Sequence, residues 1–358
     1  MVREVTEGSA TFNADRDAVW VSRYGLFMGM LTAALLLAIA ISLAVVAVGV
    51  PVRKLAMALL DREGLTADQR LIVLSLRLPR VLAAALVGSA LSVSGLLFQG
   101  LFQNPLADPY VIGSSGGAVL GASVGVFLLP SLTIAGFGAT ALLGFVGAAS
   151  SILLVYALAR VNGRTPVVTL LLAGFAVSTM LSYSSYFLEV LDRDFGMGLR
   201  VLASWLHGTI GQPNWDQLTI CAIMLAVGLA AAVPLARRLN TLSLGEEYAT
   251  HLGIQVQQTR IAIIIVGSIL TAAAVALGGL ISFVGLVVPH MMRMVLGPDH
   301  TRLLPATALG GAMFLLLADT AARTIIAPAE LSVGVLTAFI GGPFFLFLLR
   351  KTKRETLL

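Results

Sequence analysis

The sequence predicts an all-α membrane protein, a bundle of about ten transmembrane helices. Of its 358 residues, 58% are hydrophobic and only 11% are charged, whereas a soluble domain usually carries about 25% charged residues. Several apolar runs exceed the roughly 18 residues that indicate a membrane helix. A water-soluble core could not bury so much apolar surface, so we expect one polytopic membrane domain.

The expected spans follow the apolar runs in chain order. The run after residue 23 is too long for the apolar part of a cleaved signal peptide, about 7–15 residues, so it is interpreted as a retained first helix. The eighth run is short and contains Pro289, which is typical of a broken helix buried in protein. The candidate spans are residues 24–50, 81–102, 111–129, 136–159, 166–188, 215–235, 260–280, 282–296, 303–325 and 333–349.

Basic residues orient these spans. Arginines precede the first span and follow the fourth, eighth and last, and with ten crossings these positions share one side, which the positive-inside rule makes cytoplasmic. Both termini are then cytoplasmic. Residues 1–23 form an N-terminal cytoplasmic segment, residues 24–350 form the membrane domain with a cytoplasmic segment at 237–259, and residues 351–358 form a tail.

Residues 51–80 fall on the outer side in this scheme although they are rich in positive charge. Their basic residues are Arg53, Lys54, Arg62, Arg70, Arg77 and Arg80. A basic loop on this face indicates a negatively charged partner, because complementary charge guides docking. Simple tolerance of these charges during membrane insertion is the alternative.

Two internal patterns concern packing. Residues 87–91 (VGSAL) resemble residues 266–270 (VGSIL), each shortly after an arginine, and five spans separate them, so the two copies cross in opposite directions. Inverted repeats of this kind are common in transporters. A run of glycines at every fourth position predicts a helix face that another helix approaches closely; it comprises Gly113, Gly117, Gly121 and Gly125.

The composition excludes several classes of function. Cys221 is the only cysteine, so neither an internal disulfide nor a CxxC site is possible. None of the three lysines follows a glycine, which excludes a Walker A nucleotide loop, and no HExxH metal pattern occurs. No basic stripe with interleaved aromatic residues supports nucleic-acid binding. We therefore expect no enzyme activity of the chain itself and no permanently bound cofactor or metal.

Energy for transport must then come from an ion gradient or a partner chain. An ion-coupled secondary transporter usually places ionisable residues deep in the membrane, whereas the span interiors here are almost free of Asp, Glu, Lys and Arg, with Asp319 as the best exception. This class remains the alternative. A membrane-embedded enzyme is disfavoured because Ser282 and His290 lack a third catalytic partner.

Four segments together resemble the permease subunits of the iron-siderophore, heme and vitamin B12 uptake family (the FecCD type), over about residues 24–350. The segments are residues 76–80 (LRLPR), 103–109 (QNPLADP), 113–117 (GSSGG) and 283–293 (FVGLVVPHMMR). The resemblance implies the permease of a type II ABC importer in a bacterial or archaeal inner membrane. Such a permease acts as a homodimer with two cytoplasmic ATPases, which use the ATP, and a periplasmic or lipid-anchored substrate-binding protein.

The expected cargo is a bulky iron chelate (ferric siderophore or heme) or cobalamin. The resemblance also implies that Arg77, Arg80 and Arg323 contact acidic residues of the binding protein. For Arg323, an ion pair with Asp319 four residues earlier is an alternative compatible with docking.

The cytoplasmic segment contains a predicted short helix ended by Gly253, with acidic residues in its first turn that suit the helix dipole. The resemblance implies that this helix couples to the ATPase, and an ordinary amphipathic loop helix is the alternative. The coupling residues expected are Gly245, Glu246, Glu247, Ala249, Leu252 and Gly253.

Three further groups of residues complete the candidate sites. A polar stripe on the fifth span, implied to line the substrate path, comprises Ser178, Ser182, Ser185 and Glu189; hydrogen bonds to their own backbone or to a neighbouring helix are the alternative for the serines. Asn104 and Pro105 are candidates for a gate or for a simple helix stop. His207 is either a heme ligand or, more commonly for a lone histidine, a hydrogen-bonding group.

Overall fold

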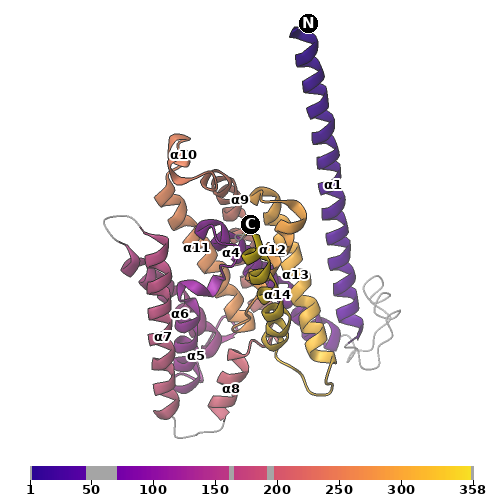
Figure 1. Ribbon diagram of the computed structural model, residues 1–358. Helices are drawn as coiled ribbons and strands as arrows, with labels where there is room; N and C mark the ends of the chain where they lie inside the picture. Colours follow the sequence, from indigo (N-terminus) through magenta and orange to yellow (C-terminus); the bar gives the residue numbers. More distant parts are fainter. Residues whose placement is uncertain (1, 46–70, 161–164, 192–196, 356–358) are drawn as a thin grey trace.

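The chain folds into an almost entirely helical bundle, as predicted (Figure 1). The computed structural model describes residues 2–45, 71–160, 165–191 and 197–355. Within these residues, seven helical segments are long and apolar enough to cross a membrane. They lie in α1 (Val2–Val45), α4 (Leu78–Phe102), α6 (Ala139–Ala159), α7 (Val167–Leu191), α9 (Trp215–Leu242), α11 (Val256–Gly278) and α13 (His300–Thr324).

Three shorter apolar helices account for the remaining predicted spans. These are α5 (Ser114–Phe127), α12 (Val284–Leu296) and the apolar part of α14 (Val333–Glu355). Each of the ten predicted spans therefore corresponds to a helix. Pro289 lies inside α12, and the helix follows Phe283, whose φ of 69° lies in the left-handed region. The expectation of a short, interrupted eighth helix is confirmed.

Two small elements on the side opposite α10 were not predicted. The ten-residue α8 (Met197–Leu206) is too short for a spanning pattern. The strands β1 (Thr133–Ile134) and β2 (Phe137–Gly138) form a hairpin whose two turn residues, Ala135 and Gly136, both have positive φ. Such turns match the right-handed twist of paired strands. The hairpin connects α5 to α6.

The second span begins earlier than predicted. Residues Ile72–Arg77 form a π-helical segment that runs directly into α4, so Arg77 and Arg80 lie on a helix and not in an exposed loop. Pro79 cannot donate a backbone hydrogen bond, and its ring crowds the preceding turn. The wider π-helical turn before it accommodates both effects. The other basic residues of the expected outer loop, Arg53, Lys54, Arg62 and Arg70, lie outside the described residues.

Helix α4 is the centre of the bundle, with 83% of its most apolar window buried, whereas α7 has only 17%. It contacts α12 and α13 of the second half of the chain, and α11 in turn contacts α5 and α6 of the first half. Each of these two helices thus contacts helices that follow the other one in sequence, and this symmetry fits the predicted inverted repeat. The helices that carry the two copies meet directly, because the Ser94 hydroxyl of α4 donates to the Gly267 carbonyl of α11 at 2.8 Å.

The glycine face of α5 packs against α6. A Cβ at Gly117 would collide with the Gly147 carbonyl, and one at Gly121 with the Leu143 carbonyl. A Cβ at Gly125 would lie 2.6 Å from the Ala139 carbonyl oxygen. The prediction of a close helix–helix approach along this stripe is confirmed, and the structure identifies the partner as α6.

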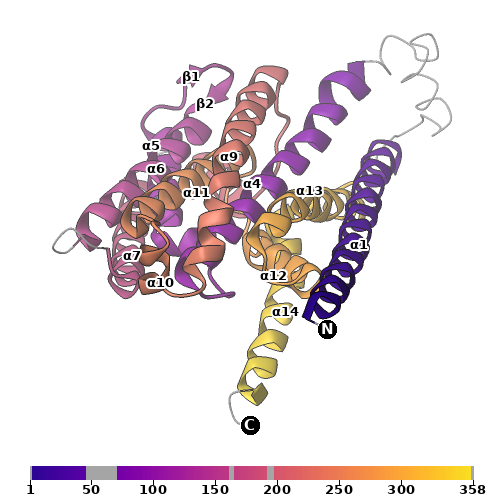
Figure 2. The same cartoon turned by 90° about the horizontal axis from the view of Figure 1, so that it is seen from above.

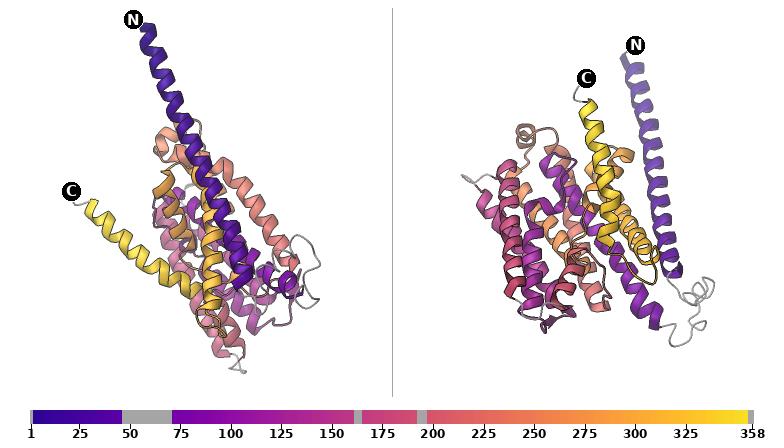
Figure 3. Two further views of the ribbon diagram at one scale, coloured as in Figure 1. Left: turned by 90° about the vertical axis from the view of Figure 1, so that its right-hand side faces the viewer. Right: turned by 60° about the horizontal axis from the view of Figure 1, so that its bottom comes forward.

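The two ends of the bundle are called the α10 end and the α8 end, after the short helix that lies at each. The α10 end carries α10 (Glu246–His251), and the α8 end carries α8 (Figure 1). The β hairpin also lies at the α8 end, because the Gln217 amide at the start of α9 donates to the Gly136 carbonyl at 2.7 Å, and the other end of α9 leads into α10. Seen from above, α5, α6 and α7 lie on one side, while α12, α13 and α14 lie on the other with α4 between them (Figure 2). Helix α1 lies at the edge of the bundle along α13 (Figure 3).

Candidate functional site

Arg80 and Arg323 meet in a cluster at the α8 end. The C-terminus of α4 lies at the α10 end, where the Gln103 amide donates to the Leu242 carbonyl at 3.0 Å. Arg80 lies 22 residues earlier, about 33 Å along the helix. The start of α13 is likewise at the α10 end, because the His300 backbone N–H donates to Asn240 of α9 at 2.8 Å. Arg323 therefore lies at the far end, next to Arg80.

Both arginines bind one buried carboxylate. Asp319 is fully buried; its Oδ1 accepts from the Arg80 guanidinium at 3.2 Å, and its Oδ2 lies 2.9 Å from Nη2 of Arg323. The ion pair between positions 319 and 323, weighed as an alternative role for Arg323, is therefore present. Arg80 and Arg323 are only 5% and 6% exposed. Neither predicted docking residue projects freely from the surface.

Two hydroxyl groups extend the cluster to α1. The Arg323 guanidinium donates to the Ser42 hydroxyl at 3.0 Å, and the Thr320 hydroxyl donates to the same oxygen at 2.8 Å. Ser42 is 1% exposed. Helix α1 is otherwise weakly packed, with only 22% of its spanning window buried. The arginine cluster thus helps to fix α1, α4 and α13 relative to one another.

A further acidic residue of this cluster, Glu330, was not predicted from the sequence. It lies in the exposed connection between α13 and α14, and its Oε2 is 2.9 Å from Nη2 of Arg80. The Glu330 side chain is 48% exposed, in contrast to the buried Asp319. A loop glutamate carries no helical or strand periodicity, so no sequence pattern signalled its proximity to an arginine 250 residues earlier.

The predicted coupling helix is α10, at the opposite end of the molecule. Gly245 and Gly253 flank it with φ of 111° and 81°, values that disfavour residues with a side chain. The Ile254 N–H donates to the Ala249 carbonyl at 2.9 Å, which closes the C-terminal turn. Glu246 forms an ion pair with Arg260 of α11. The helix is therefore held in a defined position.

The side chains of α10 divide into an inner and an outer set. Ala249 is completely buried, so it supports α10 from within and offers no surface to a partner. Leu252 is 67% exposed, and the neighbouring Leu244 and Tyr248, which the sequence analysis did not select, are 65% and 69% exposed. The exposed apolar residues of α10 and its flanks thus include Leu244, Tyr248 and Leu252.

The serine stripe of α7 faces α5. Ser178 accepts a hydrogen bond from the Gly116 N–H at 2.9 Å, and Ser185 shares a hydrogen bond with Ser123. Ser185 is buried, whereas Ser182 and Glu189 are partly exposed. Ser178 and Ser185 therefore have the contacts expected of interhelical hydrogen bonds, the alternative to a role in the substrate path.

Asn104 and Pro105 lie in the turn that ends α4 at the α10 end. The Asn104 side chain accepts from the Leu106 N–H at 2.9 Å, and Gln103 before it adopts the left-handed conformation with φ of 47°. Asn104 and Pro105 are both exposed. They form a defined Asx turn, which is compatible with the predicted helix stop and with a position at a gate.

His207 follows α8 and is exposed. Its backbone carbonyl packs against Gly334 at the start of α14, where a Cβ would collide with it. Across the described residues, no three His, Cys, Asp or Glu side chains lie close enough together to hold a metal ion. His207 therefore does not belong to a site of three such ligands within this part of the chain.

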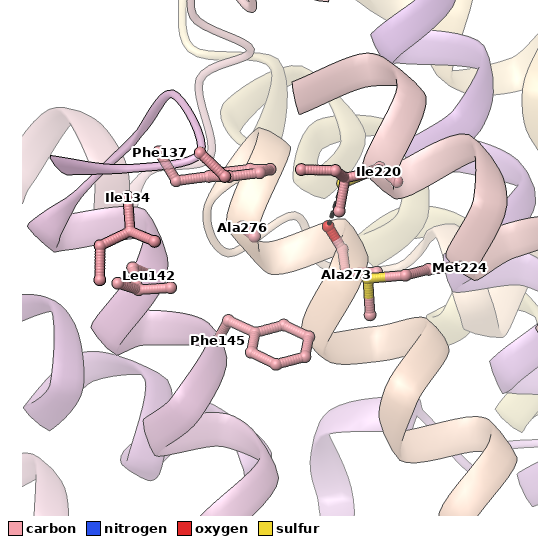
Figure 4. Close-up of a pocket in the computed structure, with 10 residues that line it drawn as sticks. Ile134, Phe137, Leu142, Phe145, Ile220, Met224, Ala273 and Ala276 are labelled. Carbon is pink, nitrogen blue, oxygen red and sulfur yellow. Dashed lines mark hydrogen bonds between the residues drawn. The ribbon is translucent and has the colours of Figure 1, made fainter. Parts of the chain in front are cut away.

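An apolar cavity of about 180 Å³ lies between the β hairpin, α6, α9 and α11. Figure 4 shows Phe137, Phe145 and Ile220 pointing into it from three elements. The thiol of Cys221, at its wall, is 3.9 Å from the Ala273 carbonyl oxygen. Its lining offers no charged group, so it does not resemble a site for an ionic cargo.

Comparison with known proteins agrees with this architecture. Residues 34–351 match the FecCD transport family. The cobalamin import system permease protein BtuC of Halobacterium salinarum is 44% identical over 287 residues, which cover 80% of this chain and 75% of that protein. The hemin transport system permease protein HmuU of Yersinia pestis is 41% identical over 285 residues, covering 79% of this chain and 84% of that protein.

Solved structures share the fold. A structure described as an inward-facing metal-chelate type ABC transporter superposes with a TM-score of 0.78 at 32% identity, covering 91% of this chain and 99% of that one. The family match over residues 34–351, together with relatives of this similarity, establishes that the chain belongs to the FecCD transport family and is a multi-pass membrane permease of the ABC importer type.

Proposed function

We propose that this permease forms the membrane path of an ATP-driven importer that carries a bulky iron chelate or cobalamin into the cytoplasm. The observation that carries the proposal is the separation of two partner surfaces at opposite ends of one bundle. The arginine cluster lies at the α8 end, and the exposed Leu244, Tyr248 and Leu252 lie at the α10 end. The α8 end then faces outward, and the α10 end faces the cytoplasm.

Each end suits a different partner. A positively charged cluster fits a substrate-binding protein with acidic residues on its contact face. An exposed apolar set on a rigid short helix fits a hydrophobic groove, the usual arrangement for a helix docking into a partner. The partner at the α10 end is an ATPase, because the chain has no Walker A loop.

A second copy of the permease completes the path. Helix α7 is the least buried of the long membrane helices, and its exposed face carries Phe175, Tyr183 and Tyr186 at 73%, 73% and 62% exposure. Aromatic side chains of this size are common in the buried centre of interfaces. We place the second copy, and the cargo path between the copies, along this face. Membrane lipid covers the remaining apolar surface.

The names of relatives support the cargo class. They include permeases for cobalamin and hemin, and a dicitrate permease of Escherichia coli, FecD, which is 40% identical over 280 residues. Asp319, the intramembrane acid on which ion coupling was considered, is held between two arginines and is not free to exchange ions with a cavity. No observation favours a secondary transporter.

The test is uptake into proteoliposomes that contain the permease with its co-purified ATPase, with ATP inside and the binding protein outside. Heme, a ferric siderophore and cobalamin are offered in turn. We expect ATP-dependent accumulation of one of them and none with a non-hydrolysable ATP analogue. Uptake without ATP under an imposed proton or sodium gradient would instead identify a secondary transporter.

A further inference from the structure

Two of the three predicted docking arginines, Arg80 and Arg323, are buried, and this raises the question of how a partner reaches them. Arg80 is 5% exposed, and its guanidinium pairs with the half-exposed Glu330. We propose that Glu330 occupies the place on Arg80 that a carboxylate of the substrate-binding protein takes on docking. Docking then replaces Glu330 with the partner's carboxylate. This inference rests on the proposed function, because it requires a docking partner with an acidic contact residue.

The two acids on Arg80 are held very differently. Asp319 is fully buried and engages both Arg80 and Arg323, so it is a permanent part of the cluster. Glu330 contacts Arg80 through one pair of atoms at 2.9 Å, and almost half of its side chain is exposed to solvent. Water that reaches the half-exposed Glu330 screens its side of the pair, so releasing Glu330 costs less than releasing the enclosed Asp319. Glu330 is therefore the carboxylate that a competing acid replaces.

Exchange of one carboxylate for another leaves the charge balance of the cluster unchanged. Among the described residues of this cluster, Arg77, Arg80 and Arg323 contribute three positive charges, and Asp319 and Glu330 contribute two negative charges. A partner carboxylate that displaces Glu330 restores the second carboxylate on Arg80, while Asp319 stays paired with it throughout. This matters because Arg80 is buried, and loss of a carboxylate from a buried arginine is costly.

The exchange needs only a small movement. The backbone after Glu330 is anchored, since the Leu331 N–H donates to the Ala322 carbonyl at 3.0 Å and the Gly334 N–H donates to the Gly208 carbonyl at 3.0 Å. Residues 325–330, in contrast, are exposed. Rotation of the Glu330 side chain toward solvent is sufficient to uncover Arg80. Arg77, one helical turn before Arg80, has a buried Nη1 without a hydrogen-bond partner and offers a second contact to the incoming acid.

The first experiment requires no binding partner. Wild-type permease–ATPase complex in nanodiscs is treated with phenylglyoxal, which modifies accessible arginines, and modification of Arg80 is measured by peptide mass spectrometry. We expect Glu330→Ala to raise Arg80 modification several-fold. Asp216→Asn, an exposed acid in the first turn of α9 on the same end, is the control and leaves it unchanged. Equal modification in all three proteins would overturn the idea that Glu330 covers Arg80.

The second experiment measures docking. The binding protein, identified by cross-linking to the complex and then purified, is titrated against wild type, Glu330→Gln, Asp216→Asn and Arg80→Gln. We expect Glu330→Gln to strengthen binding by about five-fold or more, as for two competing events that are coupled. Arg80→Gln should weaken binding, and Asp216→Asn should not change it.

The outcomes separate the inference from the proposed function. If Glu330→Gln leaves docking unchanged or weakens it while Arg80→Gln abolishes it, Glu330 is a structural tie, and the exchange is wrong although the importer function stands. If Arg80→Gln and Glu330→Gln both leave docking unchanged, the cluster is not a docking site. If the complex shows neither docking nor ATP-dependent uptake, the proposed function itself fails.

Discussion

Arg80 of α4 and Asp319 of α13 are 239 positions apart in the sequence, yet their side chains form a buried ion pair at 3.2 Å. Asp319 receives a second arginine, Arg323, at 2.9 Å, and its solvent exposure is zero. One carboxylate therefore joins the ends of two membrane helices from the two halves of the chain. This relationship makes the cluster a structural element as well as a candidate docking surface.

We predict that Asp319→Asn destabilises the permease. The substitution leaves two buried arginines, Arg80 and Arg323, without their shared counter-charge, and breaking a buried pair typically costs about 3–5 kcal/mol. Thermal unfolding of the detergent-solubilised protein measures the effect. Asp216→Asn removes the same charge from an exposed position on the same end and should cost no more than about 1 kcal/mol, the usual contribution at a helix N-terminus. Similar losses for both variants would contradict a structural role for Asp319.

The exposed surface of α10 gives a second prediction. Leu252→Asp should uncouple the ATPase, because a charge at a 67% exposed apolar position is poorly accommodated in a hydrophobic groove. Co-purification of the ATPase and cargo uptake are the measurements. Leu128→Asp, at a 60% exposed position after α5 at the other end, is the matched control and should retain both. Normal co-purification and uptake with Leu252→Asp would rule out α10 as the coupling element.

The glycine stripe of α5 gives a third prediction. Gly117→Ala places a methyl group against the Gly147 carbonyl of α6, and we expect a loss of about 1–3 kcal/mol, as for other overpacked sites. Gly25→Ala in α1 adds the same methyl group where nothing lies within 4 Å. Both substitutions improve helix propensity equally, so their difference isolates the packing cost. The thermal midpoint of each variant is compared, and equal midpoints would argue against close α5–α6 contact.

The serine stripe of α7 gives a fourth prediction. Ser178→Ala and Ser185→Ala should each lower stability by about 0.6 kcal/mol, the average worth of a hydrogen bond between membrane helices. Ser182→Ala, on the same helix without a hydrogen bond to α5, should not. Cargo uptake per folded protein should be unchanged in all three. A selective loss of uptake in the Ser178 and Ser185 variants, with normal stability, would instead show that these serines line the substrate path.

The sequence predicted the architecture well because the hydrophobic effect acts on local composition. Apolar runs located all ten spans, Pro289 marked the short eighth helix, and Gly117 and its neighbours identified a close-packing face. Short elements escaped prediction. The ten residues of α8 and the two-residue strands of the hairpin are too brief to establish a period of their own.

Prediction of the candidate sites was less complete, for a reason visible at Arg80. Charge pattern and resemblance selected Arg77, Arg80 and Arg323 but treated the region before residue 81 as an exposed loop. The π-helical segment Ile72–Arg77 extends the helix, and the arginines are thereby placed against α13. Similarly, Ala249 was predicted to contact the ATPase because it is apolar. The orientation of α10 instead points its side chain into the bundle, where it is completely buried.

The sequence by itself determined that the chain crosses the membrane many times, which helices do so, and that it has no nucleotide site of the Walker A kind, because each property depends on residues adjacent in the chain. Only the tertiary structure decided which charges meet. Glu330 approaches Arg80 and Ser185 approaches Ser123 through contacts between helices distant in sequence. In the low-dielectric interior, a charge or hydroxyl must find a partner, and the fold alone selects that partner.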